Sequence, residues 1–273
     1  MILCTVNRRF TLVDETKTFP LLWDRRINGM GVVISVFDGG IDTTQPELKD
    51  SYDPMLIYNF VEKITDQHTG THHHGTKCAG LIVGKANNER CGVGAAYGAR
   101  IGAVRLYGGS TFTAQYPKNM NTFIFIAIAG TVGRPLTQTA ENVERLGRYG
   151  RNGKGTVFLW TTGNEGPNDH CGYNWYVQRK EVFALSAVTK TGGKQAYGER
   201  CTGALASCIG GNSGTPTSKL FTTLPNAQCS KSFTGTSACP PIVSAAIACL
   251  LQVIWKSDSE TSYGYYYSVI STN

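Results

Sequence analysis

Four segments of the sequence each place one chemically reactive side chain beside glycine. They are FDGGID with Asp38, HHHGTKCAG with His74, WTTGNEG with Asn164 and FTGTSACPP with Ser237. Serine is a weak nucleophile unless a neighbouring base takes its proton and an acid orients that base. Asp38, His74 and Ser237 supply these three residue types, so the sequence predicts acyl transfer by nucleophilic catalysis.

The tetrahedral intermediate of acyl transfer carries an oxyanion that needs hydrogen-bond donors. A helix that begins at Ser237 places unpaired backbone N–H groups and the positive end of its dipole beside the nucleophile. Asn164 lies in a glycine-flanked turn after an apolar run, and its side-chain amide is expected to donate the second hydrogen bond. Taken singly, these residues are ordinary turn and capping residues. Their combination is what favours catalysis.

Apolar, often β-branched runs predict the strands that must position these side chains. The runs are residues 32–37, 101–107, 123–129, 156–160 and 182–188. Continuous apolar runs are typical of strands buried on both faces of a parallel sheet. Segments of helical character between them indicate an α/β domain. In such sheets ligands bind at the carboxyl ends of the strands, and Asp38 and Asn164 occur at these ends.

Two helices are predicted from apolar spacing. Residues 139–149 form an amphipathic helix with charges on its solvated face, and Gly150 is expected to end it. From Ser237 onward the chain is apolar nearly all round a helix, so that helix is expected in the core. The run 238–255 approaches the length of a membrane span, but its prolines and Gln252 favour the interpretation as a buried helix.

Composition excludes several classes of protein. The 273 residues are 41% apolar and 16% charged, which is typical of one globular domain and not of a disordered chain. The net charge of +7 is scattered without a lysine stripe interleaved with aromatics, so nucleic-acid binding is not expected. The nine cysteines are not arranged as CxxC pairs, which favours an oxidising compartment over metal knuckles and leaves at least one thiol free.

The sequence argues against two other kinds of site. The three adjacent histidines 72–74 point in different directions and no matching carboxylate pattern follows, which argues against a catalytic metal. The glycines of CGVGAAYGARIGAV do not match the dinucleotide-binding pattern, and turns or tight packing account for them better.

The chain order of aspartate, histidine and serine is that of the subtilisin-type triad. GTSAxxP, HGTxxAG and the Gly-Asn-x-Gly turn together resemble the subtilases. HGTKCAG, ANNERCGVGAAYGARIGAVRLY, VVISVFDGGID and CSKSFTGTSACPP resemble the kexin and furin branch, the proprotein convertases. The resemblance covers most of residues 23–254. It implies a subtilisin-like three-layer α/β domain, with a mostly parallel central sheet flanked by helices.

The resemblance implies a serine endopeptidase that acts through an acyl-enzyme on Ser237. Asp38 is then the orienting acid, His74 the general base and acid, and Asn164 an oxyanion donor together with the backbone N–H of Ser237. The alternative is a pseudoprotease or binding module that retains these residues without activity.

The resemblance also implies disulfides and bound calcium. It pairs Cys91 with Cys229 and Cys171 with Cys201, and makes Cys78 a free thiol near the catalytic histidine. The pairing of Cys4, Cys208, Cys239 and Cys249 stays open. One calcium site would use Glu47 and Asn88 with backbone oxygens near Lys85, Arg90 and Gly92, and part of a second would use Asp169 and Glu199. Calcium normally takes six or more oxygen ligands.

The sequence departs from the convertases at acids that would select basic substrates. Gly39 and Gly133 stand where the family has pocket acids, AIAGTVGRP shortens a further acidic stretch, and Cys171-Gly172 lacks another aspartate. Charge pairing in such pockets gives selectivity, so dibasic specificity is expected to be weakened.

Partners and location follow from the same resemblance. It implies polypeptide or proprotein substrates, an inhibitory propeptide, a monomeric state, and a secretory-pathway (Golgi, membrane-associated through parts absent from this chain) or extracellular location. Residues 1–273 are expected to form one peptidase domain, with no propeptide, P domain, signal peptide or membrane span evident.

Overall fold

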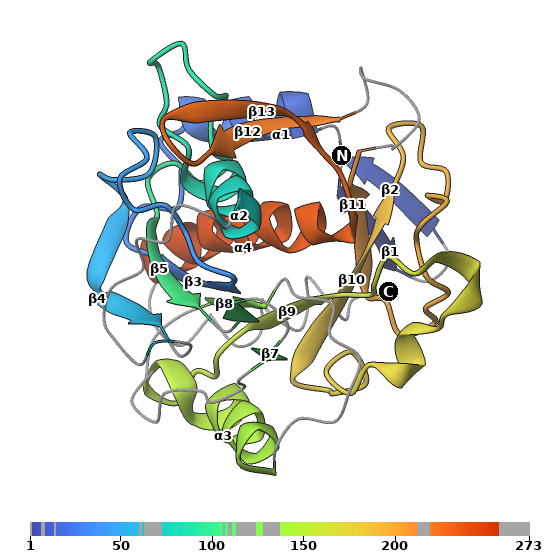
Figure 1. Cartoon of the computed structure of the whole chain (residues 1–273). Helices are drawn as coiled ribbons and strands as arrows, with labels where there is room; N and C mark the ends of the chain where they lie inside the picture. Colours follow the sequence, from blue (N-terminus) through green and yellow to red (C-terminus); the bar gives the residue numbers. More distant parts are fainter. Residues whose placement is uncertain are drawn as a thin grey trace.

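The computed structural model describes residues 2–6, 9–13, 15–59, 62, 73–105, 107–108, 111–112, 124–127, 137–211 and 219–256. A nine-stranded sheet runs through the middle, in the order β2-β1-β11-β10-β9-β8-β3-β5-β4 (Figure 1). The strands from β4 to β11 in this order pair in parallel, and β1 and β2 extend the β11 edge in antiparallel fashion. This is the mostly parallel sheet that the apolar runs predict.

The sheet strands have these bounds: β1 (Ile2–Val6), β2 (Arg9–Val13), β3 (Val33–Asp38), β4 (Tyr52–Asn59), β5 (Arg100–Arg105), β8 (Ile124–Ala127), β9 (Phe158–Thr161), β10 (Val182–Val188) and β11 (Ala206–Ile209). Each of the predicted apolar runs coincides with one strand to within a few residues. Strands β1, β2, β4 and β11 were not predicted. The β4 sequence YDPMLIYN contains proline and lies at a sheet edge, so its apolar pattern is interrupted.

Helices cover both faces of the sheet, so the protein has three layers (Figure 1). Helices α1 (Glu15–Asp24), α2 (His73–Val83) and α4 (Cys239–Lys256) contribute to the larger core on one face. Helix α3 (Thr137–Gly153) packs on the other face, where Val143 and Leu146 are buried. The subtilisin-like α/β fold is confirmed.

Helix α4 is the buried helix that its all-round apolar pattern predicts. Among the described residues, the stretch Thr236–Ile254 is the one long and apolar enough to cross a membrane, but 72% of that apolar window is buried within the protein. Even its polar Gln252 is buried, because its side chain bonds the backbone of the Arg26–Gly29 turn. Interior packing therefore explains the composition of this helix.

One predicted helix boundary is wrong. Helix α3 continues through Gly150 and ends at Gly153. A Cβ atom on Gly150 would lie 2.1 Å from Thr156 Oγ1, so this glycine permits a close approach within the helix and does not terminate it. Gly153, at φ +87°, has the left-handed conformation that commonly ends a helix.

A hairpin outside the main sheet links α2 to the serine motif. Strands β12 (Leu220–Leu224) and β13 (Gln228–Phe233) are antiparallel and pack on α2 (Figure 1). Thr222 and Thr223 donate hydroxyl hydrogen bonds of 2.6 Å to α2 carbonyls. The remaining elements are β6 (Tyr107–Gly108), β7 (Thr111–Phe112) and the 3-10 turns η1 (Gly166–Asn168), η2 (Cys171–Tyr173) and η4 (Thr236–Ala238).

Candidate active site

Asp38 and His74 form a direct hydrogen-bonded pair. Asp38 is the last residue of β3 and is buried, and His74 lies in the first turn of α2 with its side chain 37% exposed. The distance from His74 Nδ1 to Asp38 Oδ2 is 2.6 Å. The other carboxylate oxygen of Asp38 accepts the backbone N–H of Gly39 at 2.6 Å. Both oxygens of the acid are therefore engaged, and one ring nitrogen of the histidine is fixed.

The close approach of α2 to the end of β3 depends on Gly75. A Cβ atom at this position would lie 2.3 Å from Gly40 O and 3.0 Å from Asp38 Cβ. The glycine of the HHHG motif therefore lets the helix backbone contact the loop that follows Asp38. This contact brings His74 within hydrogen-bond distance of the acid.

The environment of His74 favours its charged form. Burial is the largest single influence and opposes the imidazolium, but the charge and hydrogen bond of Asp38 together with the neighbouring Cys78 outweigh it and raise the pKa of His74 well above its ordinary value of 6.5. The ring of Phe233 packs edge-on against the imidazole, with a centroid distance of 5.6 Å. An acid on one side and an aromatic ring on another hold the imidazole in place.

The free thiol of Cys78 lies beneath the histidine. Its Sγ is 3.9 Å from His74 Nδ1 and 4.0 Å from the backbone oxygen of Ser237, to which it donates a weak hydrogen bond. Burial raises the pKa of this thiol, which keeps it protonated and poorly nucleophilic. The same turn of α2 therefore contacts both Asp38 and the residue that carries the predicted nucleophile.

Ser237 lies in the 3-10 turn η4 and not in the first turn of the long helix. Helix α4 begins two residues later, at Cys239, so the prediction of a helix start at Ser237 is corrected to a tighter turn that leads into it. Gly235 precedes this turn with φ +119°, a conformation that favours glycine. The sequence GTSA therefore forms a sharp bend between β13 and α4, with Ser237 at its middle.

Asn164 lies beside this bend. Its Oδ1 accepts hydrogen bonds of 2.9 Å from both the backbone N–H and the hydroxyl of Thr236. A Cβ atom added to Gly235 would lie 3.7 Å from both Ser237 N and Asn164 Oδ1, and 3.8 Å from Asn164 Nδ2. The two predicted oxyanion donors therefore border the same small space, which the glycine leaves open.

Tyr197 is a residue of this site that sequence reasoning missed. Its hydroxyl accepts the backbone N–H of Gly235 at 3.0 Å and lies 3.3 Å from Gly210 O, to which it donates. Burial raises the pKa of Tyr197 to about 12, so the hydroxyl keeps its proton. No motif marks this tyrosine, because its role depends on contacts between distant segments.

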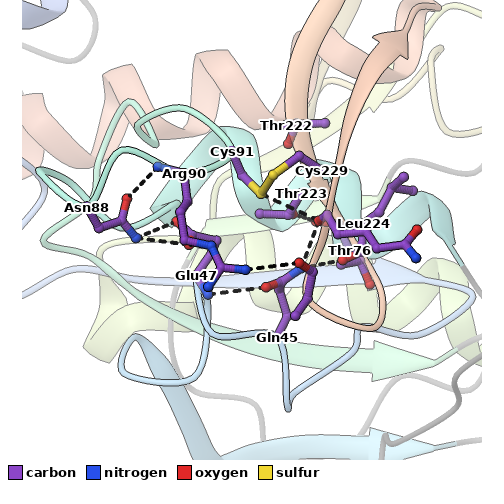
Figure 2. The surroundings of a disulfide bond; sticks show 12 residues. Gln45, Glu47, Thr76, Asn88, Arg90, Cys91, Thr222, Thr223, Leu224 and Cys229 are labelled. Atoms are coloured by element: carbon purple, nitrogen blue, oxygen red, sulfur yellow. Dashed lines mark hydrogen bonds and ion pairs between the residues drawn. A yellow bond between two sulfur atoms is a disulfide. The ribbon is translucent and has the colours of Figure 1, made fainter.

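The first predicted calcium ligands are brought together. Glu47 is buried, and its two carboxylate oxygens each accept a 2.9 Å hydrogen bond from Asn88 Nδ2 (Figure 2). Arg90 Nε is 3.9 Å from the same carboxylate. A buried carboxylate beside an amide suits a hard cation, which would bind after Asn88 turned its oxygen inward. The donor set fits calcium, with Arg90 as a competing cation.

Asp169 and Glu199, the second predicted pair, lie close enough to repel each other. Burial raises the pKa of Glu199, and the negative charges of Asp169 and Glu165 raise it further. A Cβ atom on Gly163 would lie 1.7 Å from Glu199 Oε1, so the carboxylate contacts the turn that carries Asn164. A cation at this pair would relieve the repulsion, which fits the predicted chemistry.

The structure contains both disulfides that the resemblance implies, Cys91–Cys229 (Figure 2) and Cys171–Cys201. It also contains a third, Cys208–Cys239, whose partners the sequence left open. Cys78 and Cys249 are free and buried, and the side chain of Cys4 lies outside the described residues.

The shortened pocket segment AIAGTVGRP, with Gly133, lies beyond the part of the chain whose side chains the structure describes. Among the described residues, one group of three side chains could hold a metal ion. It consists of Asp38, His74 and Cys78, whose ligand atoms lie within 4.8 Å of one another. Within this group, His74 Nδ1 is hydrogen-bonded to Asp38.

Similarity to known proteins extends over most of the chain. Residues 29–265 match the profile of the subtilase family. Furin-like protease 1, isoform 1-CRR, of Drosophila melanogaster is 32% identical over 247 residues, which cover 84% of this chain and 22% of that protein. Furin of Homo sapiens is 33% identical over 248 residues, covering 84% of this chain and 31% of furin. The chain thus spans less than a third of the length of these relatives.

The fold agrees with a solved peptidase structure. The Aeromonas sobria serine protease, determined in complex with the chaperone ORF2, superimposes with a TM-score of 0.72 at 17% identity, covering 84% of this chain and 48% of that chain. At this identity the likeness concerns the fold.

Proposed function

This chain belongs to the subtilase family, and on that premise we propose that it is a serine endopeptidase that hydrolyses peptide bonds through an acyl-enzyme on Ser237. The observation that carries the proposal is the 2.6 Å contact of His74 Nδ1 with Asp38. It is supported by the Ser237 turn, where the backbone N–H of Ser237 and the amide of Asn164 both lie next to Gly235. These are the orienting, basic and oxyanion-binding functions that acyl transfer requires.

The reaction begins with proton transfer from the nucleophile. Because Asp38 holds Nδ1, the second ring nitrogen of His74 is left to take the proton of Ser237 Oγ as it attacks the carbonyl carbon. The imidazolium is stabilised by Asp38 and then protonates the leaving amine. Water, deprotonated by His74, releases the carboxylic acid and regenerates Ser237.

Asn164 and the backbone N–H of Ser237 bind the oxyanion in this proposal. The double hydrogen bond from Thr236 occupies the Asn164 oxygen and leaves its amide nitrogen to donate. Such preorganised donors stabilise the transition state more than the ground state.

Substrates in this proposal are polypeptides or proproteins without a strong requirement for paired basic residues. Gly39, after the catalytic acid, and Gly172, after Cys171, offer no carboxylate where the convertases have one. The relatives are furins and furin-like proteases. A secretory or extracellular location, a monomeric state and a single peptidase domain are part of the same proposal, and the disulfides suit an oxidising compartment.

Calcium is proposed as a structural ion. Glu47 and Asn88 would hold one ion, and Asp169 with Glu199 would contribute to a second. Bound calcium would neutralise buried carboxylates and brace the loops that carry them. An inhibitory or chaperoning propeptide is proposed as a partner, in keeping with the chaperone bound by the Aeromonas sobria protease.

The second candidate function is that of an inactive binding module. The chain lacks an acid after Cys171, close to the Asp169 and Glu199 pair, and this absence favours the binding module. A substrate pocket can be lost while the catalytic residues remain.

Turnover of an unbiased peptide mixture distinguishes the two functions. The folded, calcium-supplied chain is incubated with the mixture, and new termini are identified by mass spectrometry beside a Ser237→Ala variant. We expect cleavage that the variant lacks, at sites without a dibasic consensus. Equal peptide profiles for both proteins would reject peptidase activity.

A further inference from the structure

The turn that carries Ser237 is attached to one sheet strand at both of its ends. At the leading end, the backbone N–H of Gly235 donates to Gly210 O at 2.9 Å, directly after β11. At the trailing end, Cys239 is disulfide-bonded to Cys208 in β11, with a Cα–Cα distance of 5.4 Å. Ser237 lies midway between these two attachments.

The two attachments are packed without space for movement. Both Cys208 and Cys239 are fully buried, at 0% exposure. A Cβ atom on Gly210 would lie 2.6 Å from Gly235 O, so the backbone after β11 directly contacts the turn. Tyr197 adds a third connection, because its hydroxyl joins Gly235 N to Gly210 O.

We propose that the Cys208–Cys239 disulfide is a positioning element for the nucleophile, which clamps the Ser237 turn to β11 and thereby sets the rate of acylation. The inference rests on the proposed peptidase function and extends it. The bond acts through Ser237 and does not touch substrate. A displacement of about 1 Å at a reacting group costs on the order of a hundredfold in rate. A disulfide two residues from the nucleophile can therefore change the acylation rate through a small shift of Ser237.

A disulfide also stabilises the fold, and the chain offers a matched control for that effect. Cys171–Cys201 joins residues 30 apart in sequence, and Cys208–Cys239 joins residues 31 apart. Loop-closure entropy depends on the length of the closed loop, so losing either bond relaxes the unfolded chain equally. A difference in rate between the two double alanine variants then reflects where each disulfide lies relative to Ser237, and not its general stabilisation of the fold.

The experiment compares Cys208→Ala/Cys239→Ala with Cys171→Ala/Cys201→Ala and the wild type. Reaction with a fluorophosphonate probe gives the maximal inactivation rate and the probe concentration at half-maximum. We expect the first variant to lose about tenfold or more in maximal rate, with the half-maximal concentration within twofold of wild type. The control variant is expected to lose clearly less maximal rate than the first variant under the same conditions, because Cys171 adjoins the pocket position Gly172 but lies outside the Ser237 turn.

A second measurement does not depend on activity. Amide hydrogen exchange of residues 234–239 is expected to accelerate in Cys208→Ala/Cys239→Ala and to stay at the wild-type rate in the control. If alanine leaves the core unfolded, Cys208→Val/Cys239→Ala refills the volume and is used in its place. Peptide mapping of the unreduced wild type should recover residues 208 and 239 in one linked fragment.

Three results overturn the clamp. They are recovery of both thiols as free in the folded wild type, unchanged exchange at residues 234–239 in the folded variant, and an unchanged maximal rate. A wild type that never reacts with the probe contradicts the proposed function instead, and hydrogen exchange still decides whether the bond holds the turn.

Discussion

Thr236 directs both of its hydrogen-bond donors at a single atom, Oδ1 of Asn164, at 2.9 Å each. The residue next to the nucleophile thus fixes the orientation of a side chain 72 positions away in the sequence. Because Thr236 occupies the oxygen of this asparagine, its amide nitrogen is the group left to donate. The orientation of the proposed oxyanion donor is therefore set by the residue that precedes Ser237.

Removing the hydroxyl of Thr236 should slow acylation through Asn164. Thr236→Val keeps the shape of the side chain and loses one hydrogen bond, so we expect about a tenfold lower maximal rate of fluorophosphonate reaction. Thr236→Ser retains the donor and should stay near the wild-type rate. Equal losses in the two variants would show that the methyl packing, and not the hydroxyl, matters.

Removing the oxyanion donor itself should cost more. Asn164→Ala is expected to lower the maximal rate of peptide cleavage by about a hundredfold to a thousandfold, with KM little changed. Because Thr236 acts through Asn164, adding Thr236→Val to Asn164→Ala should cost nothing further. Additive losses in this double-mutant cycle would contradict the arrangement.

The pH profile should report the Asp38 and His74 pair. The base must be neutral to accept the serine proton, and Asp38, with a contribution from Cys78, raises the pKa of His74 well above 6.5 despite burial. The imidazole therefore stays protonated to higher pH, and the acylation rate should rise with pH to a midpoint above 6.5. Circular dichroism at each pH controls for unfolding. A midpoint at or below 6.5 would count against the pairing.

The contact between α2 and the loop after β3 makes Gly75 sensitive to substitution. In Gly75→Ala the new Cβ meets Gly40 O at 2.3 Å, so backbone must shift and His74 should move away from Asp38. We expect a lower Tm and a large loss of probe reactivity. Gly203→Ala is the matched control, because nothing lies within 4 Å of its added Cβ. Similar behaviour of the two variants would refute the tight approach.

Calcium should stabilise the fold through Glu47. With calcium at a hundredfold excess over its Kd, we expect Tm to rise by about 5–10 °C relative to chelator. Glu47→Gln should lose most of this increment, since it removes the buried charge. Glu144→Gln, on the exposed surface of α3, should keep it. A calcium response that is the same in both variants would place the ion elsewhere.

Strands β3, β5, β8, β9 and β10 and helices α3 and α4 follow from apolar periodicity, because buried parallel strands and core helices have continuous apolar patterns. The β12–β13 hairpin does not, since most of its buried positions are polar, namely Thr222, Thr223 and Ser230. Its placement on α2 depends on hydroxyls that bond helix carbonyls. Such contacts have no signature in local sequence.

In the candidate site, too, some residues could be predicted from the sequence and others could not. Asp38, His74, Asn164 and Ser237 were found from their motifs, and the structure brings Asp38 to His74 and Asn164 to the Ser237 turn. Tyr197 and the Cys208–Cys239 pair could not be found in this way. Their roles arise from three-dimensional proximity, and cysteine spacing alone does not fix connectivity.

Reaction of the folded chain with a fluorophosphonate probe, followed by mapping of the modified residue, tests whether Asp38, His74 and Ser237 act together. The probe needs an assembled nucleophile, base and oxyanion site but no particular peptide. We expect one adduct, located on Ser237 by fragment mass spectrometry and absent from Ser237→Ala and Asp38→Ala. A folded, calcium-supplied chain with no adduct, or with one on another residue, would contradict it.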